Sequence, residues 1–235
     1  MKICINVIAT GKYIEFVPQL IYSIDKYFLI GHDITVNVFT DSDSLACVVI
    51  NTTRLYLIQH KIPSYKFPEA TLLRYHIMLD VDYDCDYIFY LDADMRIVDY
   101  VGDEILGDLV AVRHPGYYIA KNAGAWETRA ESLAYIKPED RKKYFCGGVQ
   151  GGSKDYYTTA MIIMSEWIDI DLKAGVMPVF HDESILNKFL ISREYKELSC
   201  AYCIPEAMYK RRYSKIEHIK PKILALEKDF NYFRN

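Results

Sequence analysis

The chain has 235 residues and 51% of them are hydrophobic, which is enough apolar material for one large α/β domain. Its net charge of −4 and its pI of about 5.9 exclude the basic footprint of most nucleic-acid-binding proteins. No stretch approaches roughly 18 consecutive apolar residues and the N-terminus lacks a signal-peptide layout, so we expect no transmembrane segment. The six cysteines are scattered, and we interpret them as reduced core residues of a cytoplasmic protein.

The first part of the chain alternates between strand and helix patterns. Three apolar runs predict strands, namely 1–9, 34–40 and 54–59. Two segments carry apolar side chains at helical spacing, namely 13–28 and 68–79. Residues 86–91 predict a fourth strand, which we expect to be buried because no charge occurs from Tyr87 to Leu91. This alternation is typical of a mostly parallel, doubly wound sheet.

Two carboxylates, Asp92 and Asp94, follow directly after the fourth strand. Residues i and i+2 of an extended chain point to the same side, so both can converge at the carboxyl end of the strand, where open α/β sheets bind ligands. Two hard oxygen ligands suit Mg²⁺ or Mn²⁺ carrying a diphosphate. A strand that merely ends in a polar turn has the same pattern, so the pair alone leaves both interpretations open.

After Asp94 the alternation stops. A short strand over 109–112 precedes the segment 121–143, whose mixed charge and weak periodicity are typical of a functional loop. The tail from Tyr209 is the one basic region of the chain, with Lys228 and Arg234 near its end. Taken by itself, such a tail is best interpreted as a solvated run of charge.

Residues 146–153 include four glycines, which allow the backbone to approach a ligand closely. We expect Ser153 to cap a helix from Lys154 to about Trp167. A further helix is predicted over 185–191, with an imidazole and two carboxylates directly ahead of it at His181, Asp182 and Glu183.

Several motifs in a fixed order resemble a known family. They include Lys12-Tyr13, Val38 to Asp41, Asp92 to Met95, His114-Pro115-x-Tyr117-Tyr118, Gly147 to Ser153 and His181 to Lys188. Together they resemble glycosyltransferase family 6, which contains the histo-blood-group A and B transferases and the α1,3-galactosyltransferase. The resemblance covers nearly the whole chain but lacks the membrane anchor and stem of the animal enzymes. We therefore expect a stand-alone catalytic domain of the microbial or viral type.

The resemblance implies a single GT-A domain over residues 1–235, with a mostly parallel, Rossmann-like sheet. Residues 1–112 would bind the nucleotide sugar, 113–208 would form the acceptor-binding and catalytic half, and 209–235 would be a mobile basic tail. The implied activity is transfer of N-acetylgalactosamine or galactose from a UDP-sugar to the 3-OH of a galactoside, in α linkage with retention. It would depend on Mn²⁺ or Mg²⁺ and involve no nucleic acid.

Functional residues of the family carry over to matching positions. Asp92 and Asp94 match the metal ligands, and Arg74 matches the arginine that bridges the first aspartate and the donor sugar. Glu183 matches the carboxylate beneath the anomeric carbon and, with His114 and His181, would contact the acceptor. The remaining donor-contacting positions match Ile8, Thr10, Tyr13, Cys146, Gly147, Gly148, Asp182, Lys228 and Arg234.

Departures from the family pattern concern the acceptor more than the donor. The family's Tyr-Glu-Arg-Arg-Pro is here Trp126 to Ala130, the tryptophan before His181 is Phe180, and the aromatic-acidic segment is Ala207 to Lys210. In the family, two positions of the glycine run lie against the C2 substituent of the donor sugar, and they match Cys146 and Gly148. Small residues there favour N-acetylgalactosamine over galactose, because a larger side chain would collide with the acetamido group.

Two other classes of function compete with this prediction. A phosphatase of the haloacid-dehalogenase type also uses Asp-x-Asp, but it places the pair after its first strand and follows it with threonine. Here Met95 and Arg96 follow the pair. A non-catalytic sugar-binding module would use aromatic side chains as platforms, although Asp182 and Glu183 speak against it. Turnover of a UDP-sugar separates the classes, because a lectin releases no UDP.

Overall fold

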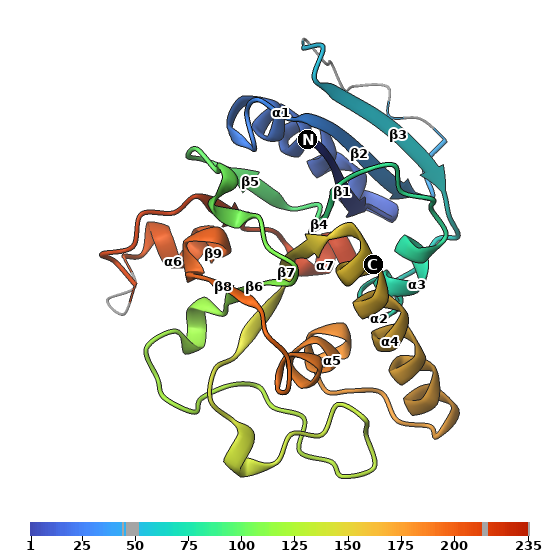
Figure 1. Cartoon of the computed structure of the whole chain (residues 1–235), viewed down its shortest axis with the longest axis vertical. Helices are drawn as coiled ribbons and strands as arrows, with labels where there is room; N and C mark the ends of the chain where they lie inside the picture. The colour runs from blue at the N-terminus through green and yellow to red at the C-terminus, as the bar shows by residue number, and fades with distance from the viewer. Residues whose placement is uncertain (44, 46–51, 213–215, 235) are drawn as a thin grey trace.

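A computed structural model describes residues 1–43, 45, 52–212 and 216–234, with the side chain of Arg234 left out. Its centre is a seven-stranded sheet in the order β3-β2-β1-β4-β7-β6-β8 (Figure 1). In that order the strands are Leu55–Lys61, Asp33–Thr40, Lys2–Ile8, Tyr87–Leu91, Phe145–Ser153, Val110–Arg113 and Lys196–Leu198. All neighbouring pairs are parallel except the two that β7 makes. The predicted α/β class with a mostly parallel sheet is confirmed.

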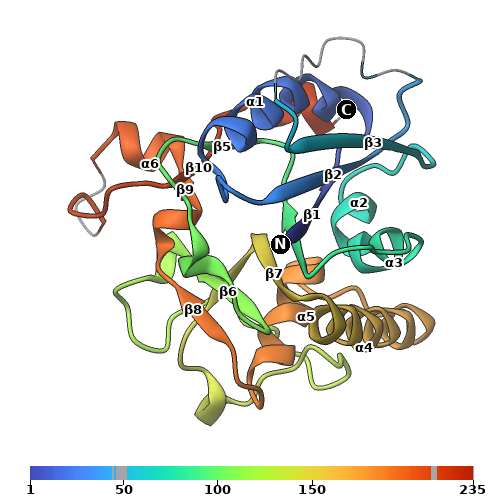
Figure 2. The same ribbon diagram turned by 45° about the horizontal axis from the view of Figure 1, so that its top comes forward.

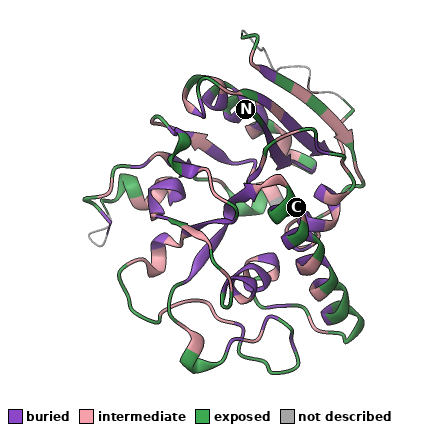
Figure 3. Ribbon diagram, viewed as in Figure 1, coloured by how far each residue is buried: buried purple, intermediate pink, exposed green. Residues whose placement is uncertain are grey.

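The sheet separates two hydrophobic cores. Helices lie on both sides of the sheet (Figure 2). Side chains alternate along β1, so that Ile3, Ile5 and Val7 join the core that includes buried residues of α1 (Val17–Tyr27). Cys4 and Ile8 join the other core, with residues of α3 (Arg74–Leu79), α4 (Lys154–Lys173) and α5 (His181–Leu190). Buried residues fill the central strands, and the outer side of α4 is largely exposed (Figure 3).

Several element boundaries differ from those predicted. The segment 13–28 starts as a 3-10 helix (Gly11–Phe16) before α1, which has Pro18 in its first turn. The segment 68–79 is divided at Leu73 into α2 (Glu69–Leu72) and α3. Ser153 precedes α4 as predicted, but its side chain makes no capping hydrogen bond, and α4 extends beyond Trp167. The helix predicted over 185–191 begins at His181, so the two carboxylates lie in its first turn.

The glycine run proves to be a strand, β7, which no periodicity predicted because glycine has no side chain to alternate and is depleted in strands. Two of its glycines are explained by backbone packing alone. A Cβ atom on Gly151 would lie 2.4 Å from the carbonyl oxygen of Ile88, and one on Gly152 would lie 2.0 Å from that of Asp108. Only a residue without a side chain fits between these neighbouring backbones.

A second sheet of three short strands joins the end of the chain to the aspartate pair. Its order is β5 (Met95–Ile97), β10 (Ile223–Ala225) and β9 (Ile204–Pro205). Because β5 starts directly after Asp94, pairing of β10 with β5 brings the C-terminal segment to the aspartates, and the Leu226 N–H donates to the Asp94 carbonyl at 2.8 Å. In sequence, the short helix α6 (Glu206–Lys210) lies between β9 and β10, and α7 (Phe230–Arg234) follows β10.

The 3-10 helices after the first one are short. They comprise Asp103–Ile105, Pro115–Tyr117, Pro138–Asp140 and Cys200–Tyr202. Within the described ranges, none of the helices combines the length and the apolar character that a membrane crossing requires.

We predict that Gly152→Ala destabilises the protein strongly, because the added methyl group collides with backbone rather than with a movable side chain. Overpacking of this kind costs roughly 3 kcal/mol or more, which corresponds to a Tm lower by roughly 6–12 °C. Thermal unfolding followed by circular dichroism measures the change. Gly116→Ala is the control, since its Cβ would meet only the His114 ring, at 3.1 Å. Equal Tm values for the two variants would contradict the packing argument.

Candidate active site

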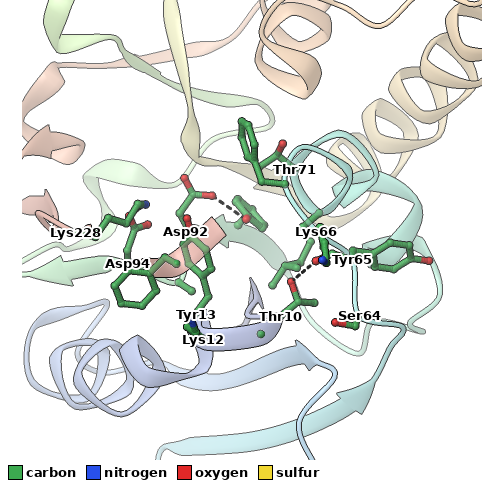
Figure 4. A pocket seen from close by; sticks show the side chains of 17 residues that line it. Thr10, Lys12, Tyr13, Ser64, Tyr65, Lys66, Thr71, Asp92, Asp94 and Lys228 are labelled. Atoms are coloured by element: carbon green, nitrogen blue, oxygen red, sulfur yellow. Dashed lines mark hydrogen bonds and ion pairs between the residues drawn. The ribbon is translucent and has the colours of Figure 1, made fainter. Parts of the chain in front are cut away.

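A cavity of about 290 Å³ lies at the carboxyl ends of β1 and β4 (Figure 4). One wall is formed by Ile8, Thr10 and Tyr13, and another by the segment 64–71. Asp92 and Asp94 line it in the turn that follows β4, where the Met95 N–H donates to the Asp92 carbonyl at 3.1 Å. Ala93 lines the cavity as well, so the turn brings the two aspartates together rather than the side-chain alternation of an extended strand. The C-terminal segment closes it with Lys228 and Phe233. Six residues that were matched to donor or metal contacts therefore share one cavity: Ile8, Thr10, Tyr13, Asp92, Asp94 and Lys228.

Arg74 joins the aspartate pair to the first turn of α5. Its Nη2 atom lies 3.4 Å from Oδ1 of Asp92, and its Nε atom lies 3.0 Å from Oδ2 of Asp182. Its Nη1 atom donates to the carbonyl of Gly147 at 2.6 Å. The arginine is only 2% exposed, so its charge depends on these partners, as expected for an arginine on an apolar helix face.

The second aspartate pairs with the C-terminal segment. Burial and the neighbouring Asp92 raise the pKa of Asp94, while the ion pair with Lys228 acts in the opposite direction. The Lys228 ammonium also lies 5.0 Å from the ring centre of Tyr13, and the ring of Phe233 packs 5.5 Å from the same tyrosine. These contacts place the end of the chain against the wall that the resemblance assigns to the nucleotide. Arg234 belongs to α7, but its side chain lies outside the described part of the chain.

Two carboxylates with raised pKa values meet at β7. The Gly147 N–H donates to Oε2 of Glu183 at 2.8 Å, and a Cβ atom on Gly147 would lie 2.9 Å from Oδ2 of Asp182. Burial raises the pKa of both Asp182 and Glu183 to about 7, with Arg74 opposing the rise at Asp182 and the Gly147 N–H opposing it at Glu183. Carboxylic acids whose pKa is raised to near neutral pH are typical of functional sites.

The two positions matched to the C2 substituent of the donor have different surroundings. A Cβ atom on Gly148 would lie 2.7 Å from Oδ2 of Asp92 and 2.6 Å from Cε of Met95, so this glycine borders the aspartate pair. Cys146 is 5% exposed and belongs to the hydrophobic core, where its thiol donates to the Val112 carbonyl. Its side chain does not line the cavity.

The two histidines matched to the acceptor lie on different elements. The Nδ1 atom of His114 accepts from the Gly116 N–H at 3.1 Å, and its ring packs 5.8 Å from that of Tyr144. Burial lowers the pKa of His114 to about 4, so it is neutral at physiological pH. His181 begins α5 with φ = 49°, and its ring packs edge-on against Phe67 at 5.2 Å.

The loop over 121–143, which was predicted to be functional, is hydrogen-bonded to the segment that leads into α5. Glu127 is 1% exposed, and its carboxylate accepts from the Nε and Nη2 atoms of Arg129 at 2.9 and 2.6 Å. The same carboxylate accepts from the Val179 N–H at 2.8 Å, and Arg129 Nη2 donates to the Met177 carbonyl at 2.6 Å. The loop thereby fixes the chain two residues before His181.

Sequence reasoning missed several cavity residues. Tyr90 donates its hydroxyl hydrogen to Oδ1 of Asp92 at 2.8 Å, and the two-residue spacing of this pair could have indicated it. The segment 64–67 reaches the cavity only through tertiary folding, for example through the hydrogen bond from Thr10 Oγ1 to the Tyr65 carbonyl at 2.8 Å. No pattern in its sequence indicates that position.

The aspartate pair fits a hard divalent cation whose remaining coordination positions are filled by a bound substrate and water. In the described ranges, no cluster of three or more His, Cys, Asp or Glu side chains could hold a metal by itself. Mg²⁺ and similar ions are commonly bound by one or two carboxylates together with substrate phosphates, so two protein ligands suffice. The repulsion between Asp92 and Asp94, visible in the raised pKa of Asp94, favours a cation between them.

Comparison with known families matches the whole chain, residues 1–235, to the family described as glycosyltransferase family 6. The chain belongs to this family. This confirms the resemblance that was derived from the order of the motifs.

Three similar proteins illustrate the range of family 6. Globoside alpha-1,3-N-acetylgalactosaminyltransferase 1 of Gallus gallus is 32% identical over 86% of this chain and 61% of its own length. Histo-blood group ABO system transferase 1 of Rattus norvegicus is 29% identical over 80% of this chain and 56% of its own length. O-antigen biosynthesis glycosyltransferase WbnI of Escherichia coli is 28% identical over 92% of this chain and 93% of its own length. The chain thus spans less than two thirds of these two animal proteins and nearly all of the bacterial one.

The raised pKa of Glu183 predicts a pH-dependent gain of stability in Glu183→Gln. Because the pKa of Glu183 is higher in the folded than in the unfolded protein, the folded state binds its proton more tightly. The wild-type protein therefore loses stability as the pH rises from about 4.5 to about 7. The variant has no such loss, so its free energy of unfolding relative to wild type should increase by about 1–2 kcal/mol between pH 5 and pH 8, allowing for partial exposure. Urea unfolding at both pH values measures it, with Glu131→Gln on the surface as the control. A difference that does not change with pH would refute the assignment.

Proposed function

We propose that the protein is a retaining glycosyltransferase that moves N-acetylgalactosamine, or alternatively galactose, from a UDP-sugar to the 3-OH of a galactoside. The observation that carries the proposal is the network in which Arg74 joins Asp92 to Asp182. It connects a cavity that contains two candidate metal ligands to a second carboxylate pair, an arrangement that suits sugar transfer from a metal-bound diphosphate. Membership of family 6 and the names of its relatives support the same reaction class.

The cavity has the parts that a nucleotide diphosphate needs. The ring of Tyr13 offers a stacking surface for the base, and Ile8 and Thr10 adjoin it in the wall. Asp92 and Asp94 would hold a divalent ion, which supplies charge neutralisation for the departing diphosphate when it is bound. Lys228 would add a second positive charge beside the diphosphate after giving up its pairing with Asp94.

The second carboxylate pair suits the sugar end of the donor. Asp182, held by Arg74, would accept hydrogen bonds from the sugar hydroxyls, and the Gly147 N–H fixes the orientation of Glu183. Departure of UDP leaves positive charge on the anomeric carbon, which the ionised Glu183 would balance electrostatically or by a transient covalent bond. A same-face route through an ion pair also yields retention, and in that route Glu183 would act only through its charge.

The preference for N-acetylgalactosamine rests on Gly148. The resemblance places this residue against the C2 substituent of the donor sugar, and a residue without a side chain there adds no atom that would collide with an acetamido group. The neighbouring side chains are Asp92 and Met95, which would lie 2.7 and 2.6 Å from a Cβ atom on Gly148. Cys146 adds little to the argument, because its side chain belongs to the core. The GalNAc-transferase names of several relatives, including those from Gallus gallus and Homo sapiens, point in the same direction.

The competing classes are less well supported. Asp92 and Asp94 follow β4, which is the fourth strand along the chain rather than the first, so the layout of a haloacid-dehalogenase-type phosphatase is not met. A purely sugar-binding module gives no reason for two poised carboxylates beside a buried arginine. The assignment of 113–208 to the acceptor and the mobility of the tail stay predictions.

A UDP-release screen tests the proposal and the donor preference together. We expect turnover of UDP-N-acetylgalactosamine, with a panel of galactosides and Mn²⁺, to exceed that of UDP-galactose, UDP-N-acetylglucosamine and UDP-glucose. Gly148→Ala should shift selectivity toward galactose. A strong preference of the wild type for UDP-galactose would refute the Gly148 argument alone, whereas release of no UDP from any donor would refute the transferase proposal.

Removal of the metal should abolish most turnover. EDTA, or the substitution Asp94→Asn, is expected to lower kcat on the order of 10²-fold, because the charge on the leaving diphosphate is no longer neutralised. Added Mn²⁺ should restore the EDTA-treated wild type but not the variant. Asp84→Asn serves as the control, because Asp84 is an exposed partner of Lys2. Full activity of Asp94→Asn would exclude Asp94 as a metal ligand.

A further inference from the structure

The two carboxylate oxygens of Asp92 have different surroundings. Oδ1 accepts from the Tyr90 hydroxyl at 2.8 Å and pairs with Nη2 of Arg74 at 3.4 Å. Oδ2 is the oxygen that faces Gly148, where a Cβ atom would lie only 2.7 Å away. Both protein donors therefore fall on Oδ1, and no residue that the structure describes donates a hydrogen bond to Oδ2. The carboxylate is held in one orientation, with Oδ2 left for a ligand.

Tyr90 is the residue whose hydroxyl group can set the orientation of the Asp92 carboxylate. It is 3% exposed, it precedes Asp92 by two residues on β4, and it contributes to the cavity wall. The guanidinium carbon of Arg74 lies 4.2 Å from its ring centre, at a cation–π distance. A buried tyrosine hydroxyl needs a hydrogen-bond partner, and here that partner is a candidate metal ligand rather than a backbone carbonyl.

Tyr90 thus contacts both members of the ion pair between Asp92 and Arg74. Its hydroxyl fixes the carboxylate, and its ring supports the guanidinium that continues to Asp182 at 3.0 Å and to the Gly147 carbonyl at 2.6 Å. Partners that hold a metal ligand in this way tune the affinity for the metal, because they remove the rotational freedom that binding would otherwise have to freeze.

We propose that Tyr90 is a positioning residue of the transfer site: its hydroxyl holds Oδ1 of Asp92 so that Oδ2 is presented to the divalent ion that accompanies the diphosphate. This inference rests on the proposed function, since it assigns to Tyr90 a task at the metal pair. A purely structural Tyr90 would satisfy its own hydroxyl, and removing that hydroxyl would change stability without changing metal affinity.

The substitution Tyr90→Phe separates these roles, because it keeps the ring against Arg74 and removes only the hydroxyl. We expect Mn²⁺ affinity, read from the free-Mn²⁺ signal in electron paramagnetic resonance with UDP present, to fall on the order of tenfold. The Mn²⁺ concentration for half-maximal UDP-sugar turnover should rise by a similar factor. UDP affinity, measured by calorimetry in EDTA, should stay at the wild-type value.

Tyr83→Phe is the matched control. Tyr83 is also buried, at 8% exposure, and donates a single hydrogen bond, to the Met78 carbonyl at 2.7 Å, without lining the donor cavity. This variant should lose stability like Tyr90→Phe and keep wild-type Mn²⁺ affinity. Wild-type Mn²⁺ affinity in Tyr90→Phe, or an equal loss in both variants, would overturn the assignment to Tyr90. A wild-type protein that binds no Mn²⁺ would instead overturn the metal-dependent function, and the role of Tyr90 with it.

Discussion

The buried guanidinium of Arg74 is the constraint on which the rest of the site depends. Removing an ion from water costs several kcal/mol even after relaxation, so a nearly unexposed arginine requires well-placed partners. Asp182, Asp92 and the Gly147 carbonyl provide them, from three different elements. Because loss of one partner would leave charge uncompensated, the guanidinium fixes the relative positions of β4, β7 and α5 around the cavity.

The architecture of the sheet makes this convergence possible. Strand β7 lies antiparallel beside β4, so the start of β7 comes close to the carboxyl end of β4 and to the aspartates. Gly147 then allows the first turn of α5 to approach the strand, since a Cβ atom would collide with the Asp182 carboxylate. Asn187 strengthens the same contact, accepting from the Phe145 N–H at 2.9 Å and donating to its carbonyl at 2.8 Å.

The balance of charge explains what the site can bind. Within the described part of the chain, the ion pairs of these four carboxylates, Asp92, Asp94, Asp182 and Glu183, involve Arg74 and Lys228 alone, and Glu183 is held by a backbone N–H instead. Part of this excess is relieved by protonation, as the pKa values of about 7 at Asp182 and Glu183 indicate. A diphosphate would add further negative charge, so its binding calls for a cation at the open end of the site, which is where Asp92 and Asp94 lie.

The sequence by itself determined the strand–helix alternation, the position of the aspartate pair directly after the fourth strand and the family, because these depend on local periodicity and on motifs whose residues lie close together in the chain. Only the tertiary structure decided that the glycine run is a strand, since glycine leaves no periodic signal and Gly151 and Gly152 are required by backbones from elsewhere in the chain. The pairing of Lys228 with Asp94 joins residues 134 positions apart, and no local pattern encodes it. It arises because β10 pairs with β5, a contact that burial and register select in three dimensions.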